Sequence, residues 1–144
     1  MIYFAYGSLL DQERLRELSP TASPLRAARI PHHALCFTGR SQAWGGGTAT
    51  IGLVPNWDLW GGLYEIDEEA RSAIERSGVE DGYVWAFTSV EDIHGAEVMA
   101  GMLVKVRYLE RSPPSGQYLE ALRAGWLQWG LDPKEMLKEA PQAR

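Results

Sequence analysis

The sequence reads Tyr3-Phe4-Ala5-Tyr6-Gly7-Ser8-Leu9-Leu10 near its beginning, an aromatic segment followed at once by a glycine turn and a helical pattern. We predict a buried strand over 2–6 and a short helix over 11–18. Such a turn leaves backbone N–H groups free beside a helix N-terminus, which attracts negative charge. Gly7 permits a close approach to the backbone, and Ser8 is expected to cap the helix. On spacing alone a purely structural connection is the commoner explanation, but no other segment is so well suited to a small anion.

The composition is typical of one globular domain, which we place at 1–139 with a flexible tail at 140–144. Hydrophobic residues make up 45% of the 144 residues and charged residues 23%. The net charge of −5 and the scattered basic residues argue against a nucleic-acid partner. No segment approaches the ~20 apolar residues of a membrane span, and the first residues lack the basic region followed by a long apolar stretch that is typical of a secretion signal. We therefore predict a cytoplasmic protein without a membrane partner, whose oligomeric state the sequence does not give.

The remaining pattern mixes strands and helices. A polar, glycine-rich loop is predicted over 39–47. Because strands and helices alternate irregularly, we predict an α+β fold around a twisted or barrel-like sheet. Strands are predicted over 25–38, 48–54, 60–66, 83–90 and 98–108, with a turn at 55–58, and helices over 68–76 and 117–129 and from Asp132-Pro133 onward.

Other reactive residue types give weaker signals. His32 and His33 are adjacent, so in a strand they point to opposite faces, and no metal site is predicted. Cys36 is the single cysteine and lies among apolar residues, which is typical of a core position. Ser41 lacks the G-x-S-x-G context of a hydrolase nucleophile. Trp44, in the glycine-rich loop, is a candidate for a pocket wall.

Four collinear blocks give the chain a resemblance to the γ-glutamyl cyclotransferases. They cover most of the sequence and occur in the order found in that family. The blocks are Tyr3-Phe4-Ala5-Tyr6-Gly7-Ser8-x-Leu10, Ser41-Gln42-x-Trp44-x-Gly46-Gly47-x-Ala49-Thr50-Ile51, Trp60-Gly61, and Pro113-Pro114-Ser115-x-Gln117-Tyr118 with the later Gly125 and Gly130-Leu131.

The resemblance implies an α+β domain whose mixed sheet closes into a partial barrel, with surrounding helices and one pocket. It also implies an enzyme that needs no metal or organic cofactor and acts on a small γ-glutamyl substrate. The α-amine of the γ-glutamyl group attacks its own γ-carbonyl, releasing 5-oxoproline and an amine or amino acid. The amides of Ser8, Leu9 and Leu10 would then bind the substrate carboxylate or the developing oxyanion. The other residues expected at the substrate are Tyr6, Gly7, Trp44 and Tyr83.

The sequence departs from the family at its acid. The enzymes of the family carry a glutamate where this chain has Ser77, and a serine cannot perform the same proton transfer unaided. Glu75 falls on the solvent side of the predicted helix. Glu80 and Asp81 follow the helix end, and by elimination we predict Glu80 as the acid/base. Leu9 replaces an asparagine found in many members, which is expected to alter specificity more than chemistry.

These departures leave three hypotheses open. The first is a γ-glutamyl cyclotransferase. The second is a non-catalytic member that binds a small carboxylate ligand in the same pocket, because Ser77 replaces the acid. The third is a different reaction on the same scaffold that uses Tyr83 or Ser77.

Overall fold

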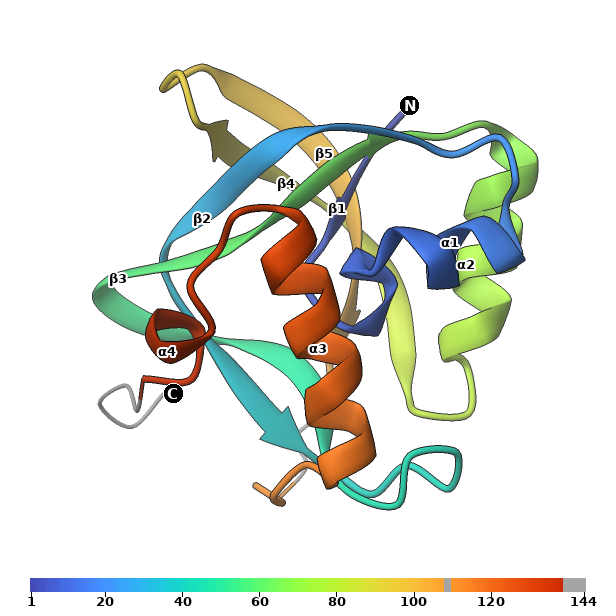
Figure 1. Ribbon diagram of the computed structural model, residues 1–144, viewed down its shortest axis with the longest axis vertical. Coiled ribbons are helices and arrows are strands. Elements are labelled where there is room, and N and C mark those ends of the chain that lie inside the picture. The colour runs from blue at the N-terminus through green and yellow to red at the C-terminus, as the bar shows by residue number, and fades with distance from the viewer. Residues whose placement is uncertain (108–109, 139–144) are drawn as a thin grey trace.

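The computed structural model describes residues 1–107 and 110–138, and these residues build a closed barrel with helices outside it (Figure 1). The strand order is β1-β3-β2-β4-β5, and β5 pairs with β1 to close the barrel. That closing pair is parallel, with Tyr3 opposite Gly101, whereas the other pairs are antiparallel. The predicted α+β barrel is confirmed. The strands are β1 (Ile2–Ala5), β2 (Ser23–Thr38), β3 (Thr48–Glu65), β4 (Tyr83–Asp92) and β5 (Glu97–Lys105).

The α-helices of the described residues follow the predicted order, and each begins at a side-chain cap. In Figure 1, α3 crosses the front of the barrel, while α1 and α2 lie together at one side. Asp11, Asp67, Ser115 and Asp132 each accept a hydrogen bond from the first turn of the helix that follows. No helix in residues 1–107 and 110–138 is long and apolar enough to cross a membrane. The helices are a short 3-10 helix η1 (Ser8–Leu10), α1 (Gln12–Leu18), α2 (Glu68–Gly78), α3 (Gly116–Gln128) and α4 (Pro133–Met136).

Two expectations concern residues outside the described part. The predicted tail, 140–144, and residue 139 lie there, as does Tyr108 at the predicted end of the last strand.

The prediction of two strands separated by a turn at 55–58 is wrong, because β3 runs continuously through this segment. Asn56 has a φ of 69° and His32, on the neighbouring strand, a φ of 62°. The N–H of Asn56 donates to Nδ1 of His32 at 3.1 Å, and the β2–β3 register shifts between Pro31 and His33. Turn-forming residues here produce a bulge within one long strand rather than a break.

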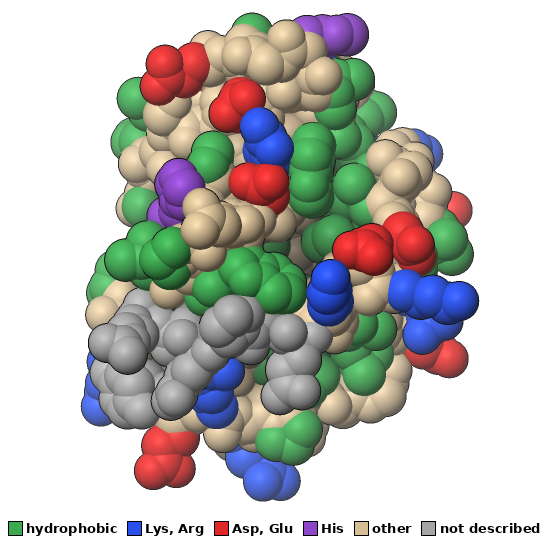
Figure 2. Space-filling model, turned by 90° about the vertical axis from the view of Figure 1, so that its left-hand side faces the viewer, with side chains coloured by type: hydrophobic (Ala, Val, Ile, Leu, Met, Phe, Trp, Pro, Cys, Tyr) green, Lys and Arg blue, Asp and Glu red, His purple; other side chains and the backbone are tan. Residues whose placement is uncertain are grey.

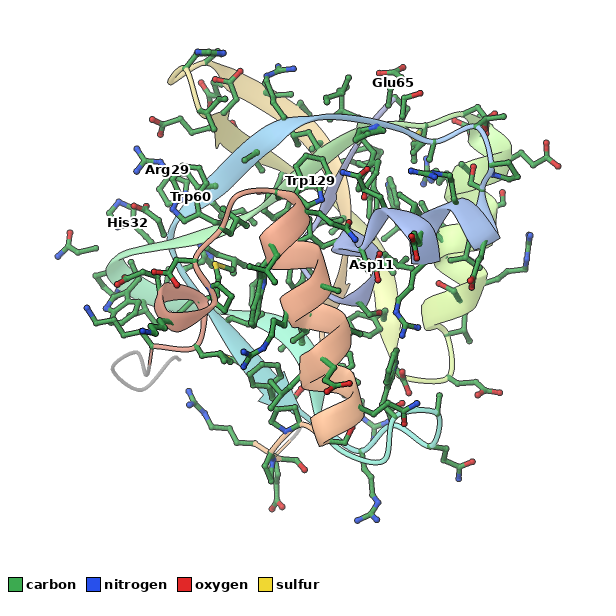
Figure 3. The ribbon with its side chains drawn as sticks, viewed as in Figure 1. Asp11, Arg29, His32, Trp60, Glu65 and Trp129 are labelled. Carbon is green, nitrogen blue, oxygen red and sulfur yellow. The ribbon has the colours of Figure 1, made fainter. Side chains whose placement is uncertain are left out.

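Paired charges link three strands on the outside of the barrel. Arg29, on β2, forms ion pairs with Asp58 of β3 at 2.9 Å and with Glu91 of β4 at 3.0 Å. Its guanidinium also lies 5.8 Å from the centre of the Trp60 ring, and Figure 3 shows the two residues together. On the face drawn in Figure 2, acidic and basic side chains are interspersed. Exposed pairs of this kind position neighbouring strands while adding little stability individually.

Candidate active site

One pocket lies at the end of the barrel where β1 ends and β3 and β4 begin. Its volume is about 260 Å³, which suits a small ligand. Segments far apart in the sequence contribute to it, including the η1 turn, α1, the glycine-rich loop and the end of α2. The lining residues are Tyr3, Tyr6, Gly7, Ser8, Leu9, Arg14, Glu17, Leu18, Trp44, Thr48, Ala49, Ser77, Gly78, Asp81, Tyr83, Leu103 and Tyr118.

The η1 turn, which lines this pocket, contains backbone N–H groups without partners among the described residues. Gly7 occupies the N-cap of η1, and the N–H groups of Ser8 and Leu9 have no hydrogen-bond partner among the described residues. The N–H of Leu10 donates to the carbonyl of Gly7 at 3.0 Å, and Leu10 is fully buried in the core. The structure therefore removes Leu10 from the predicted set of anion-binding amides and leaves Ser8 and Leu9. The expected cap at Ser8 is also wrong, because Asp11 caps α1 instead.

The end of α3 holds the η1 turn in place. The indole N–H of Trp129 and the hydroxyl of Tyr64 both donate to the carbonyl of Leu10, each at 2.9 Å. Nε2 of Gln128 donates to Oδ1 of Asp11 at 3.0 Å. Asp11 and Trp129 are labelled in Figure 3, where they lie on either side of this contact between α1 and α3. These bonds fix Leu10 and Asp11, directly after the two residues whose amides have no partner in the described part of the chain.

Two buried tyrosines, Tyr6 and Tyr118, and the half-buried Tyr83 form a polar wall of the pocket. The hydroxyl of Tyr6 donates to the carbonyl of Leu103 at 2.5 Å, and that of Tyr83 donates to the carbonyl of Ala49. Tyr118 accepts a hydrogen bond from the N–H of Ala49 at 2.8 Å. Burial raises the pKa of Tyr118 to about 12 and raises the pKa values of Tyr6 and Tyr83 further. These hydroxyls therefore remain protonated at neutral pH and cannot act as bases there.

We expect the Tyr118→Phe variant to be less stable by about 1–3 kcal/mol, because the buried N–H of Ala49 then loses its acceptor. Tyr83→Phe is the matched variant and should cost less, since a carbonyl that loses one donor keeps a second lone pair for other contacts. Urea unfolding of both variants measures the difference. Equal stability of Tyr118→Phe and the unaltered protein would contradict the expected role.

Arg14 is the one cationic side chain among the described residues that line the pocket. Its guanidinium lies 4.9 Å from the centre of the Trp44 ring, and its Nε lies 3.7 Å from Oδ2 of Asp11. That Nε is buried and has no hydrogen-bond partner in the described part of the chain. Trp44 also packs edge-on against Tyr118, at 5.1 Å between ring centroids. Stacking on Trp44 holds the positive charge of Arg14 at the pocket wall.

The residues considered for the role of acid/base lie in different surroundings. Ser77 lies at the pocket, but its hydroxyl donates to the carbonyl of Ile74 at 2.7 Å. Glu80 is exposed and is not among the lining residues, whereas its neighbour Asp81 is half-buried and lines the pocket. Oδ2 of Asp81 accepts a hydrogen bond from the Ser41 hydroxyl at 3.1 Å. Glu17, on α1, is the other carboxylate that lines the pocket, and it is exposed.

Of the predicted substrate-binding residues, the pocket brings together Tyr6, Gly7, Ser8, Leu9, Trp44 and Tyr83. Sequence reasoning did not select Arg14, Glu17 or Tyr118. Tyr118 lies within the last matched block, which was a usable signal, whereas α1 offered only an ordinary amphipathic pattern. Among residues 1–107 and 110–138, no group of three or more His, Cys, Asp or Glu side chains is placed to hold a metal ion.

The fold and the sequence both resemble known proteins, although no family model matches the chain. The human protein named gamma-glutamylcyclotransferase is 33% identical in an alignment of 136 residues that covers 90% of this chain and 72% of that protein. The mouse protein of the same name is 34% identical, with the same coverage of both chains. A solved structure of a gamma-glutamyl cyclotransferase has a TM-score of 0.87 at 30% identity, covering 99% of this chain and 89% of the other. By this similarity, the chain belongs to the γ-glutamyl cyclotransferase family.

Proposed function

We propose that this protein is a γ-glutamyl cyclotransferase that converts a small γ-glutamyl compound into 5-oxoproline and a free amine or amino acid. One observation carries the proposal: the unpaired N–H groups of Ser8 and Leu9 belong to the same pocket as a cation, Arg14, and a carboxylate, Asp81. A γ-glutamyl substrate needs these three kinds of group. Family membership supports the assignment.

In this proposal, different pocket residues bind different parts of the substrate. Arg14 attracts the α-carboxylate of the γ-glutamyl group. The amides of Ser8 and Leu9 face the γ-carbonyl oxygen and stabilise its negative charge in the tetrahedral intermediate. Tyr6 and Trp44 close the walls, so the flexible substrate is held curled with its amine near its own γ-carbonyl. Holding the two reacting groups together supplies much of the rate enhancement of an intramolecular reaction.

A non-catalytic binding protein is the second candidate, and the observation that favours it is Ser77 at the position of the family's acid. In that case the pocket binds a small carboxylate ligand without turning it over. A different reaction through Ser77 or Tyr83 has less support, because both hydroxyls already donate to backbone carbonyls. Under this second candidate, Ser77→Glu should create turnover where the unaltered protein has none.

The experiment is an assay of 5-oxoproline release from a panel of γ-glutamyl amino acids and γ-glutamyl amines, with α-glutamyl isomers as controls. We expect release from at least one γ-glutamyl compound and none from the α-isomers, which have a free γ-carboxylate in place of the γ-amide. Calorimetric titration with 5-oxoproline is run in parallel. If 5-oxoproline binds but no substrate releases it, the enzyme hypothesis is rejected in favour of the non-catalytic binding protein.

A further inference from the structure

We propose that Asp81 is the catalytic acid/base of this pocket. It would do the work of the glutamate that the enzymes of the family carry where this chain has Ser77. This inference rests on the proposed cyclotransferase function and names the group that moves its protons. It differs from the sequence-based prediction of Glu80 and concerns a residue that forms no part of the four matched blocks.

The turn after α2 directs Asp81 toward the pocket. The N–H of Gly82 donates to the carbonyl of Val79 at 3.0 Å, which closes a tight turn with Glu80 and Asp81 as its central residues. Gly82 follows with a φ of 85°, a left-handed conformation that glycine adopts readily. Within this turn Glu80 is exposed, whereas Asp81 is half-buried and lines the pocket. Two neighbouring acids in one turn thus have different surroundings.

The glycine-rich loop holds the Asp81 carboxylate in a defined orientation. Ser41 is 2% exposed, and its hydroxyl donates to Oδ2 of Asp81 at 3.1 Å while accepting the N–H of Trp44 at 3.2 Å. The backbone of Ser41 is fixed as well, because its N–H donates to the carbonyl of Gly46 at 2.8 Å. Ser41 is therefore a positioning residue that leaves Oδ1 of Asp81 available to a ligand.

A half-buried cation, Lys105, interacts electrostatically with the same carboxylate. Nζ of Lys105 donates to the carbonyl of Thr38 at 2.8 Å and lies 5.2 Å from the centre of the Tyr83 ring. Burial lowers the pKa of Lys105, and the negative charge of Asp81 opposes that shift. Asp81 therefore has a hydrogen-bond donor, Ser41, on one carboxylate oxygen and an electrostatic interaction with the ammonium of Lys105.

The rival groups lack these contacts. Glu17 is exposed, and no hydrogen bond or ion pair to its side chain occurs among the described residues. Glu80 is exposed and does not line the pocket. The hydroxyl proton of Ser77 is committed to the carbonyl of Ile74. Asp81 alone among these combines a place in the pocket with a fixed side chain.

The proton balance needs no group beyond Asp81 and the substrate. Its carboxylate takes one proton from the substrate ammonium, and the freed electron pair of the nitrogen forms a bond to the γ-carbon while the carbonyl π pair moves to oxygen. The protonated Asp81 gives that proton to the leaving nitrogen, and the oxyanion re-forms the carbonyl as the old C–N bond breaks. Asp81 then takes the second proton from the ring nitrogen and passes it to the released amine.

The test begins with the unaltered protein and its best γ-glutamyl substrate, followed by Asp81→Asn. Because general acid–base catalysis contributes roughly 100- to 10,000-fold, we expect kcat to fall within that range while 5-oxoproline still binds by calorimetry. The Glu120→Gln variant, which alters an exposed carboxylate of α3 outside the pocket, is the matched control. Asp81→Ala is assayed with added formate, a small carboxylate that should restore turnover in proportion to its concentration.

The outcomes separate this inference from the function on which it rests. No 5-oxoproline from the unaltered protein would overturn the proposed function itself. If the unaltered protein is active and the kcat of Asp81→Asn lies within tenfold of its kcat, only the role of Asp81 is overturned. A large loss confined to Glu17→Gln or Glu80→Gln would do the same. Loss of 5-oxoproline binding in Asp81→Asn, or no rescue of Asp81→Ala by formate, would assign Asp81 a structural role and also overturn the proposal.

Discussion

Replacing Ser8 by proline is expected to lower kcat roughly 100- to 1000-fold, the usual effect of deleting one donor of an oxyanion hole. Proline removes the N–H of Ser8, which bonds to no other described residue, so no bond within the fold is lost. Ser8 is the first residue of η1, where the fixed φ of proline is well tolerated. The substitution thus deletes a single proposed contact with the transition state. Steady-state kinetics on the best γ-glutamyl substrate measures the effect.

Ser8→Ala is the matched variant, because it removes the hydroxyl and keeps the N–H. It should lose far less activity than Ser8→Pro. The proposed oxyanion role places the effect of Ser8→Pro in kcat, whereas a role in holding the ground-state carboxylate would place it in KM. Similar activity of the two variants, with both folded by circular dichroism, would contradict the role of the Ser8 amide.

Trp126→Ala is expected to cost about 3–5 kcal/mol of unfolding free energy, the range measured for large aromatic residues removed from cores. Trp126 is 0% exposed and belongs to the main hydrophobic cluster, where it anchors α3 against the barrel. Because the unfolding free energy of a domain of this size is only about 5–15 kcal/mol, the substitution removes a large part of it. Activity should fall as well, because α3 supports the η1 turn through Trp129.

Two variants make this second prediction specific. Trp126→Phe should cost much less, since phenylalanine fills most of the space and removes an indole N–H that has no partner in the described residues. Leu127→Ala, at a neighbouring position that is 62% exposed, should change stability by no more than about 0.5 kcal/mol. Urea unfolding ranks the three. A Trp126→Ala variant as stable as Leu127→Ala would show that α3 does not depend on this side chain.

The order of strands and helices could be predicted from the sequence because local patterns determine it. The strand predicted over 83–90 corresponds to β4, and the helices predicted over 68–76 and 117–129 correspond to α2 and α3. The long strand β3 could not be predicted, because a bulge at Asn56 looks like a turn when its partner strand is unknown. The bulge depends on pairing with His32, a contact between residues distant in the sequence.

The candidate site was predictable where it coincides with a motif and not where it depends on orientation. The motif at Gly7 placed the candidate anion-binding turn at the pocket, although only the hydrogen bond from Leu10 to Gly7 showed which amides remain free. Spacing could not decide between Glu80 and Asp81, since adjacent residues of a turn can face either way. That choice depends on the contact with Ser41, which joins segments 40 residues apart.

The most direct test of the central claim is a mass balance of the reaction by NMR, with one γ-glutamyl amino acid as substrate and the unaltered protein as catalyst. The proposed mechanism predicts that 5-oxoproline and the free amino acid appear in equal amounts and that no glutamate forms, because the attacking nitrogen belongs to the substrate. Glutamate in place of 5-oxoproline would show that water is the nucleophile. That result, or no conversion of any γ-glutamyl compound that binds, would contradict the proposal.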